Sequence, residues 1–235
     1  MNPYQQDQLK VAVAVARGAE STFATTKLIR NTYTLLSVTL LFSAVMAGIS
    51  IAIQPPSFTG IVCLLAALAL IWLVLPKTAN STAGLGVVFA ITGLMGFGLG
   101  PMLTHYLGMP SGGSIVMTAL GSTATIFLSL SAYVMVTKKD FSFMGGFLMT
   151  GIIVAIVCML VVVGASLFGY HMPMAHLALS AMIAMLMAGF ILYDTSRIVN
   201  GGETNYLLAT VGLYLSIYNL FVSLLHLIGA FNNDD

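Results

Sequence analysis

Three charged residues in the second half of the chain, together with one lysine in the first half, are of the types that could act together chemically. Asp194 and Arg197 are three residues apart, so on a helix they share one face. Glu203 follows in a glycine turn, and Lys77 ends an earlier apolar run. Partial burial favours a protonated carboxylic acid, whereas a nearby cation favours the carboxylate. Two interpretations stay open: an interfacial ion pair that anchors a helix end, and a protonatable gate.

A stripe of small and polar residues near the C-terminus is the second pattern. Its spacing alternates between four and three residues, the 3.5-residue period of a helix in a left-handed bundle. Amides and hydroxyls are costly against lipid, so the stripe should face protein or enclosed water. It predicts either a packing seam or the lining of a central polar cavity. The stripe consists of Asn205, Ala209, Gly212, Ser216, Asn219, Ser223 and His226.

The four histidines all fall near the outer side in the topology derived below, with Met172 and Met174 among them. Interfacial anchoring is the favoured interpretation, so no metal site is predicted. Imidazole together with soft sulfur ligands suits copper or zinc, so a metal-binding or pH-sensing cluster is the alternative. The histidines are His105, His171, His176 and His226.

The sequence lacks the signatures of common catalytic sites. It contains no HExxH, no phosphate-binding Walker loop and no GxSxG. Cys63 and Cys158 each lie inside an apolar run, without a pairing motif or zinc spacing. We therefore predict a protein that is not an enzyme and carries no cofactor.

The composition indicates that the surroundings of this chain are mostly hydrocarbon. Of 235 residues, 59% are hydrophobic and 6% are charged, whereas about a quarter of the residues are charged in a typical soluble domain. A net charge of +1 gives no reason to expect nucleic acid. A polar stretch precedes the first long apolar run near Tyr33, so no cleavable signal peptide is evident. The chain is therefore predicted to be an integral protein of a lipid bilayer.

A membrane-spanning helix needs roughly 20 mostly apolar residues. Proline, glycine and charged residues separate the apolar runs that meet this test. We expect an all-α bundle of seven transmembrane helices over residues 33–230, a tail at 1–32 with two short helices (8–16 and 21–30), and a short acidic tail at 231–235. The expected spans are 33–53, 58–75, 83–106, 115–137, 142–168, 174–195 and 205–230.

The basic residues orient this bundle, because lysine and arginine are retained on the cytoplasmic side. In the seven-helix topology all eight lie on one side, and the opposite loops carry none. The N-terminus is therefore predicted to be cytoplasmic, and the C-terminus, with Asp234 and Asp235, to be outside. The eight are Lys10, Arg17, Lys27 and Arg30 in the tail, and Lys77, Lys138, Lys139 and Arg197 in loops.

Several stretches over about residues 25 to 230 have a family likeness. They are Leu28–Tyr33 (LIRNTY), Thr92–Pro101 (TGLMGFGLGP), Ala119–Thr123 (ALGST), Lys138–Phe143 (KKDFSF), Tyr193–Asp194, Gly201–Tyr206 (GGETNY) and Leu213–Phe221 (LYLSIYNLF). Together they resemble the Bax inhibitor family of seven-helix membrane proteins. Within that family they look most like bacterial members that modulate the membrane-anchored, ATP-dependent protease FtsH.

The resemblance implies a non-enzymatic protein of the bacterial inner membrane that binds and restrains FtsH, with the seventh helix central. It also implies an alternative, because some family members are pH-sensitive calcium leaks gated by two carboxylates and a basic residue. Asp194 matches the first carboxylate, Ser216 stands in place of the second, and Lys77 is an approximate match to the basic partner. The carboxylate pair is therefore incomplete in this chain.

Overall fold

The computed structural model describes residues 3–170 and 172–232, with side chains from residue 23 onward. Those residues form helices and connecting turns without a strand, and seven helices are long and apolar enough to cross a membrane. The elements are α1 (Pro3–Ile53), α2 (Thr59–Ala69), η1 (Leu70–Val74), α3 (Leu75–Thr78), α4 (Ala83–Leu107), α5 (Gly112–Thr137), η2 (Ser142–Met144), α6 (Gly145–Leu167), α7 (Pro173–Val199) and α8 (Tyr206–Phe231).

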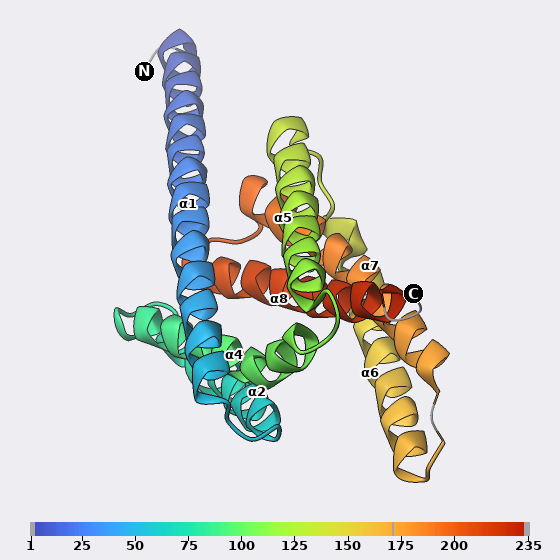
Figure 1. Ribbon diagram of the computed structural model, residues 1–235. Helices are drawn as coiled ribbons and strands as arrows, with labels where there is room; N and C mark the ends of the chain where they lie inside the picture. The colour runs from blue at the N-terminus through green and yellow to red at the C-terminus, as the bar shows by residue number, and fades with distance from the viewer. Residues whose placement is uncertain (1–2, 171, 233–235) are drawn as a thin grey trace.

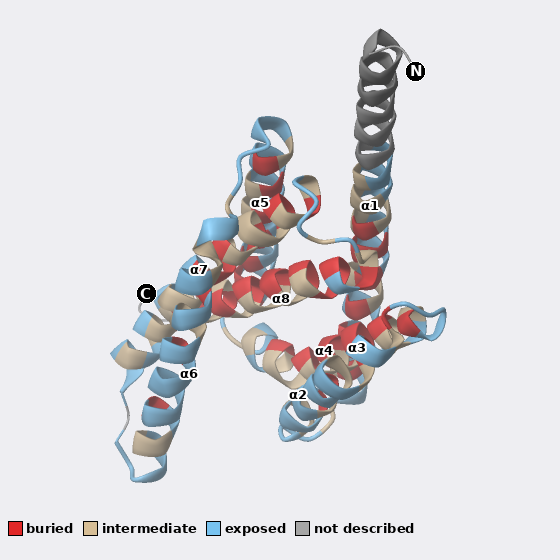
Figure 2. Cartoon of the chain, turned by 180° about the vertical axis from the view of Figure 1, so that it is seen from behind, coloured by how far each residue is buried: buried red, intermediate tan, exposed pale blue. Residues whose placement is uncertain are grey.

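Helix α8, the seventh span, lies at the centre of the bundle, where the family resemblance places it. It passes through the middle of the molecule, and α1, α4, α5 and α7 pack against it (Figure 1). Helices α2 and α6 are peripheral, since α2 packs on α4 and α6 on α7. Figure 2 shows α8 mostly buried and α6 mostly exposed. The exposed face of α6 is apolar, as expected for a helix that contacts lipid.

Helix α1 is much longer than the first predicted span. The expected tail with two short helices is instead part of one helix of 51 residues, Pro3–Ile53. At 1.5 Å per residue it is about 77 Å long, more than twice the ~30 Å hydrocarbon thickness. Its N-terminal part extends beyond the other helices (Figure 1). The predicted boundary at residue 32 is therefore not a break in the helix.

Pro76 does not end the second span as the sequence suggested. The helix continues through η1 and α3 to Thr78. Proline has no N–H, and its ring clashes with the carbonyl four residues earlier. The π-helical segment η1 precedes it, with the Leu75 amide bonded to the Leu70 carbonyl, and this wider turn accommodates the ring. Lys77 consequently lies on a helix end rather than in a loop.

Close contact between α1 and α4 depends on glycine. A Cβ atom at Gly96 would collide with the backbone and hydroxyl of Ser43, and one at Gly100 would collide with the side chain of Ser50. In hydrocarbon, helices associate largely through van der Waals contact and interhelical hydrogen bonds, so small residues at the interface are important. The glycines of α4 therefore determine how closely α1 approaches.

Gly96→Leu should disrupt the bundle, because the new side chain has no space beside Ser43. We expect the free energy of unfolding in detergent to fall by about 3 kcal/mol or more. Gly86→Leu in the same helix is the matched control, since nothing lies within 4 Å of a Cβ atom there. Thermal unfolding compares the two variants, and equal losses would contradict the packing described.

Candidate functional site

Three loops meet at one end of the bundle, which we call the basic end because Lys77, Lys138, Lys139 and Arg197 lie in or beside these loops. The side-chain amide of Asn205 donates hydrogen bonds of 2.9 Å to the Ala79 carbonyl and of 2.9 Å to the Asn80 side chain. The Asn200 amide lies 3.4 Å from the Lys139 carbonyl. These bonds join the loops at residues 79–80, 139 and 200–205, as the predicted topology requires. The cytoplasmic location of this end remains a prediction.

Arg197 pairs with Glu203 rather than with the predicted partner Asp194. One guanidinium nitrogen lies 3.4 Å from a Glu203 oxygen and 3.1 Å from the Gly202 carbonyl. The guanidinium also lies over the Tyr193 ring, 5.6 Å from its centre. Gly201 has φ +79°, a conformation that favours glycine, and the turn there brings Glu203 back to the end of α7. The sequence spacing did not reveal this reversal.

Asp194 lies on the inner side of α7, against the central helix. Its side chain is half-buried, and a Cβ atom at Gly212 of α8 would lie 3.3 Å from its carboxylate. Within the described part of the chain, the carboxylate makes no hydrogen bond or salt bridge. Arg197 attracts its charge and Glu203 repels it. Asp194 is therefore held by packing rather than by a direct partner.

The four charged candidates thus do not form one cluster. Lys77 is exposed and has no ion pair among the described residues. Ser216, which the family resemblance sets in place of the second carboxylate, donates to the Gly212 carbonyl of its own helix at 3.1 Å. Asp194 therefore faces Gly212 of α8, and the Ser216 hydroxyl, one turn further along that helix, already donates a hydrogen bond.

Members of the predicted polar stripe have different roles. Asn205 is the N-cap of α8, and its side-chain oxygen accepts bonds from the Leu207 and Leu208 amides. Ser216 bonds to its own helix, as does Asn219, whose amide donates to the Leu215 carbonyl at 2.9 Å. Gly212 packs against Asp194. These contacts are those of a capped helix and a packing seam.

A hydroxyl cluster that the sequence reasoning missed lies beside Asp194. The Tyr33 hydroxyl of α1 bonds to Ser131 of α5 and lies 3.4 Å from the Thr195 hydroxyl of α7. Ser131 and Thr195 are 3.2 Å apart. Three helices are therefore joined by one buried hydrogen-bonded group. Its members are 64 to 162 residues apart in sequence, so no local spacing could have indicated it.

The loop that precedes η2 is fixed to α7 through Asp140. The Asp140 carboxylate accepts from the Ser142 amide at 2.8 Å and from the Ser196 hydroxyl at 3.3 Å. The Ser196 oxygen also accepts from the Phe141 amide at 2.8 Å. Hydrogen bonds from Ser142, and to a lesser extent from Ser196, hold the pKa of Asp140 below its ordinary value. The carboxylate therefore stays charged at neutral pH.

The histidines do not form a metal centre among the described residues. His105 and His176 are exposed, and the half-buried His226 ring lies 6.1 Å from the Tyr106 ring. No group of three His, Cys, Asp or Glu side chains in the described part of the chain is arranged to hold a metal. His171 lies outside the described residues, so the four-histidine alternative stays a prediction.

Asn205→Ala should loosen the start of α8 by about 1 kcal/mol, since it removes the side-chain cap. Asn205→Asp keeps the accepting oxygen and loses only the amide bonds to Ala79 and Asn80. Amide hydrogen exchange at Leu207 and Leu208 should rise clearly in the alanine variant and much less in the aspartate variant. Unchanged exchange in both would refute the capping role.

The chain matches known proteins over nearly its whole length. The model of the family described as "Inhibitor of apoptosis-promoting Bax1" matches residues 25–233. A membrane protein of Vibrio cholerae is 48% identical, with 92% of this chain and 95% of that protein aligned. "Modulator of FtsH protease YccA" of Escherichia coli is 46% identical, with 94% and 98% aligned. A Pseudomonas aeruginosa protein is 44% identical, with 98% and 99% aligned.

The same Escherichia coli relative in a second strain is named "Inner membrane protein YccA". Together with the seven spanning helices, these matches identify a multi-pass protein of the inner membrane. The matched family model covers well over half of the chain. The chain belongs to the Bax inhibitor family.

Proposed function

We propose that this protein binds the membrane protease FtsH and restrains it, without catalysing a reaction itself. The observation that carries the proposal is the continuity of α1, which runs unbroken from Pro3 beyond the bundle to Ile53 within it. The 46% identity to a protein named as a modulator of FtsH gives independent support. The identity supports FtsH as the partner, and the projecting part of α1 supplies a segment that such a partner can reach.

The basic residues suggest where this meeting takes place. The positive-inside rule puts the N-terminal part of α1 in the cytoplasm, together with the basic end of the bundle. Accessible chain termini are preferred sites of proteolytic attack, so the projecting part of α1 offers an ATP-dependent protease a segment to engage. A pull on the projecting part of α1 is transmitted along one continuous helix into the bundle, where α1 packs against α4 and the central helix α8.

Three sets of contacts resist such a pull. Tyr33 joins α1 to α5 and α7 through hydroxyl groups. Ser43 bonds to the Tyr214 hydroxyl of the central helix at 2.7 Å, and its backbone lies against Gly96 of α4. Extraction of α1 therefore requires all these contacts to break together. A protein that is engaged in this way but not extracted would occupy the protease and slow the degradation of its other substrates.

The calcium-leak alternative has no comparable support. A shared proton or ion between two carboxylates needs both groups in one place. In the described part of the chain, Asp194 faces Gly212, and the family resemblance sets Ser216 where the second carboxylate would stand. We therefore propose protease binding alone as the function.

Deletion of residues 1–20 should abolish restraint while leaving the bundle inserted, because the shortened α1 keeps all the contacts from Tyr33 onward. The assay is FtsH degradation of a membrane-protein substrate in reconstituted vesicles, with and without the variant. Full-length protein should slow degradation, and the truncated chain should leave the rate as in its absence.

In a second variant, residues 1–20 are replaced by a Gly/Ser segment of equal length. This variant tests whether restraint needs the helical structure of the segment or only its length. We expect it to behave like the deletion. Protease protection of the loops checks insertion in each case. Equal inhibition by full-length and truncated protein would refute the role assigned to α1.

A further inference from the structure

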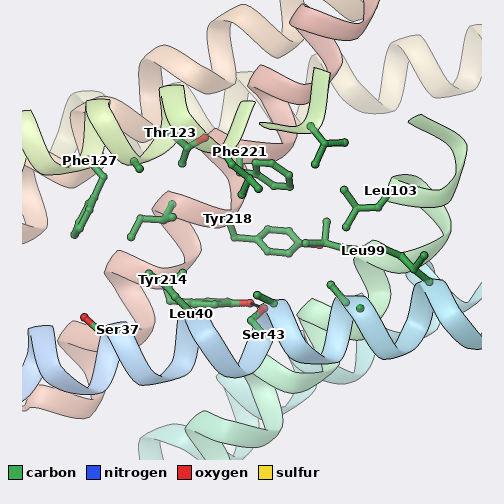
Figure 3. Close-up of a pocket in the computed structure, with 18 of the residues that line it drawn as sticks. Ser37, Leu40, Ser43, Leu99, Leu103, Thr123, Phe127, Tyr214, Tyr218 and Phe221 are labelled. Atoms are coloured by element: carbon green, nitrogen blue, oxygen red, sulfur yellow. Dashed lines mark hydrogen bonds between the residues drawn. The ribbon is translucent and has the colours of Figure 1, made fainter. Parts of the chain in front are cut away.

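A cavity of about 560 Å³ opens in the side of the bundle between α1 and α5, with α4 and α8 forming its inner walls. Figure 3 shows Tyr214, Tyr218 and Phe221 of the central helix lying one beside another along this space. Its lining lies in the middle stretches of four membrane-spanning helices. The volume falls within the range of sites that hold small organic ligands.

The mouth of the cavity faces sideways, toward the lipid. Tyr33 of α1 closes one end, where its hydroxyl bonds to Ser131 and its ring stacks on Phe127 at 6.2 Å. Beyond that point the lining residues at the two rims are exposed. They are Ser37, Ala44 and Gly48 on α1, and Leu120, Ala124 and Leu128 on α5. The opening is thus a slot closed at one end.

Except for the Tyr218 hydroxyl, the polar side chains that line the cavity are engaged by the protein itself. Ser37 donates to the Tyr33 carbonyl at 2.8 Å, and Thr123 donates to the Ala119 carbonyl at 2.7 Å. Ser43 and Tyr214 bond to each other. A buried water needs two to four polar partners, and an ion needs more. The cavity therefore offers little to water or to a cation, and its remaining wall is hydrocarbon.

We propose that this cavity binds one hydrocarbon chain of a membrane lipid, which enters between α1 and α5. Acyl chains are the molecules present at a sideways opening within the membrane-spanning region. They supply the dispersion contacts that an empty apolar space lacks. A partner helix, about 10–12 Å across, needs a groove along the whole span. The closure at Tyr33 excludes that length.

Bulky residues at the mouth test this site. Ala44→Phe and Ala124→Phe narrow the slot from its two rims, whereas Ala52→Phe adds the same bulk on an exposed part of α1 outside the cavity. Each protein is stripped of lipid in detergent, titrated with one phospholipid, 1-palmitoyl-2-oleoyl phosphatidylethanolamine, and examined by native mass spectrometry. The bound mass identifies the ligand directly.

The wild-type protein and Ala52→Phe should each saturate with one retained lipid. Affinity should fall about tenfold, equivalent to about 1.4 kcal/mol, in the mouth variants. Circular dichroism confirms folding, and either mouth variant alone suffices if the other does not fold. The proposal would be overturned if a folded mouth variant retained lipid as the wild type does, or if Ala52→Phe lost affinity equally. It would also be overturned if lipid binding to the wild type did not saturate.

Discussion

Helices α1 and α4 lie in contact only because Gly96 and Gly100 leave space for the backbone and side chains of Ser43 and Ser50. In hydrocarbon no hydrophobic force drives one helix against another, so close packing and hydrogen bonds must hold the bundle together. The same part of α1 bonds to Tyr214 of α8. The position of α1, and with it one wall of the lateral cavity, follows from this contact.

The basic end of the bundle is organised by turns and caps. Glu203 accepts bonds from the Thr204 and Asn205 amides, pairs with Arg197, and so fixes the chain between α7 and α8. Asn205 then caps α8 and ties it to the loop after α3. Asp194 stands apart from this network, against Gly212. The Arg197–Glu203 pair at this end thus fixes a single turn, and the side chains of Asn200 and Asn205 join the loops to one another.

The fold was largely predictable from hydropathy, because a span of hydrocarbon requires a long apolar run. Seven runs gave seven helices, and their ends agree within a few residues except at α1 and around Pro76. The residues before Tyr33 contain no long apolar run, so hydropathy did not indicate that α1 continues through them. A π-helical turn that accommodates a proline likewise has no simple sequence signal.

The candidate site was less predictable, since its contacts join distant residues. The sequence placed Asp194 beside Arg197 by helical spacing, yet a turn at Gly201 gave Arg197 a different partner. The hydroxyl cluster of Tyr33, Ser131 and Thr195 depends on how three helices pack, which spacing along one helix cannot show. The spacing of Asn205 fits the 3.5-residue period of the polar stripe. Because it stands at the start of α8, however, it acts as the N-cap of that helix.

We propose above that FtsH engages the protein through α1. The most direct measurement is crosslinked co-purification from native membranes, with the amount of FtsH recovered compared between this protein and an unrelated seven-helix membrane protein of similar abundance. FtsH should be clearly enriched, with crosslinks concentrated in the N-terminal part of α1. Recovery no greater than with the unrelated protein would contradict this proposal.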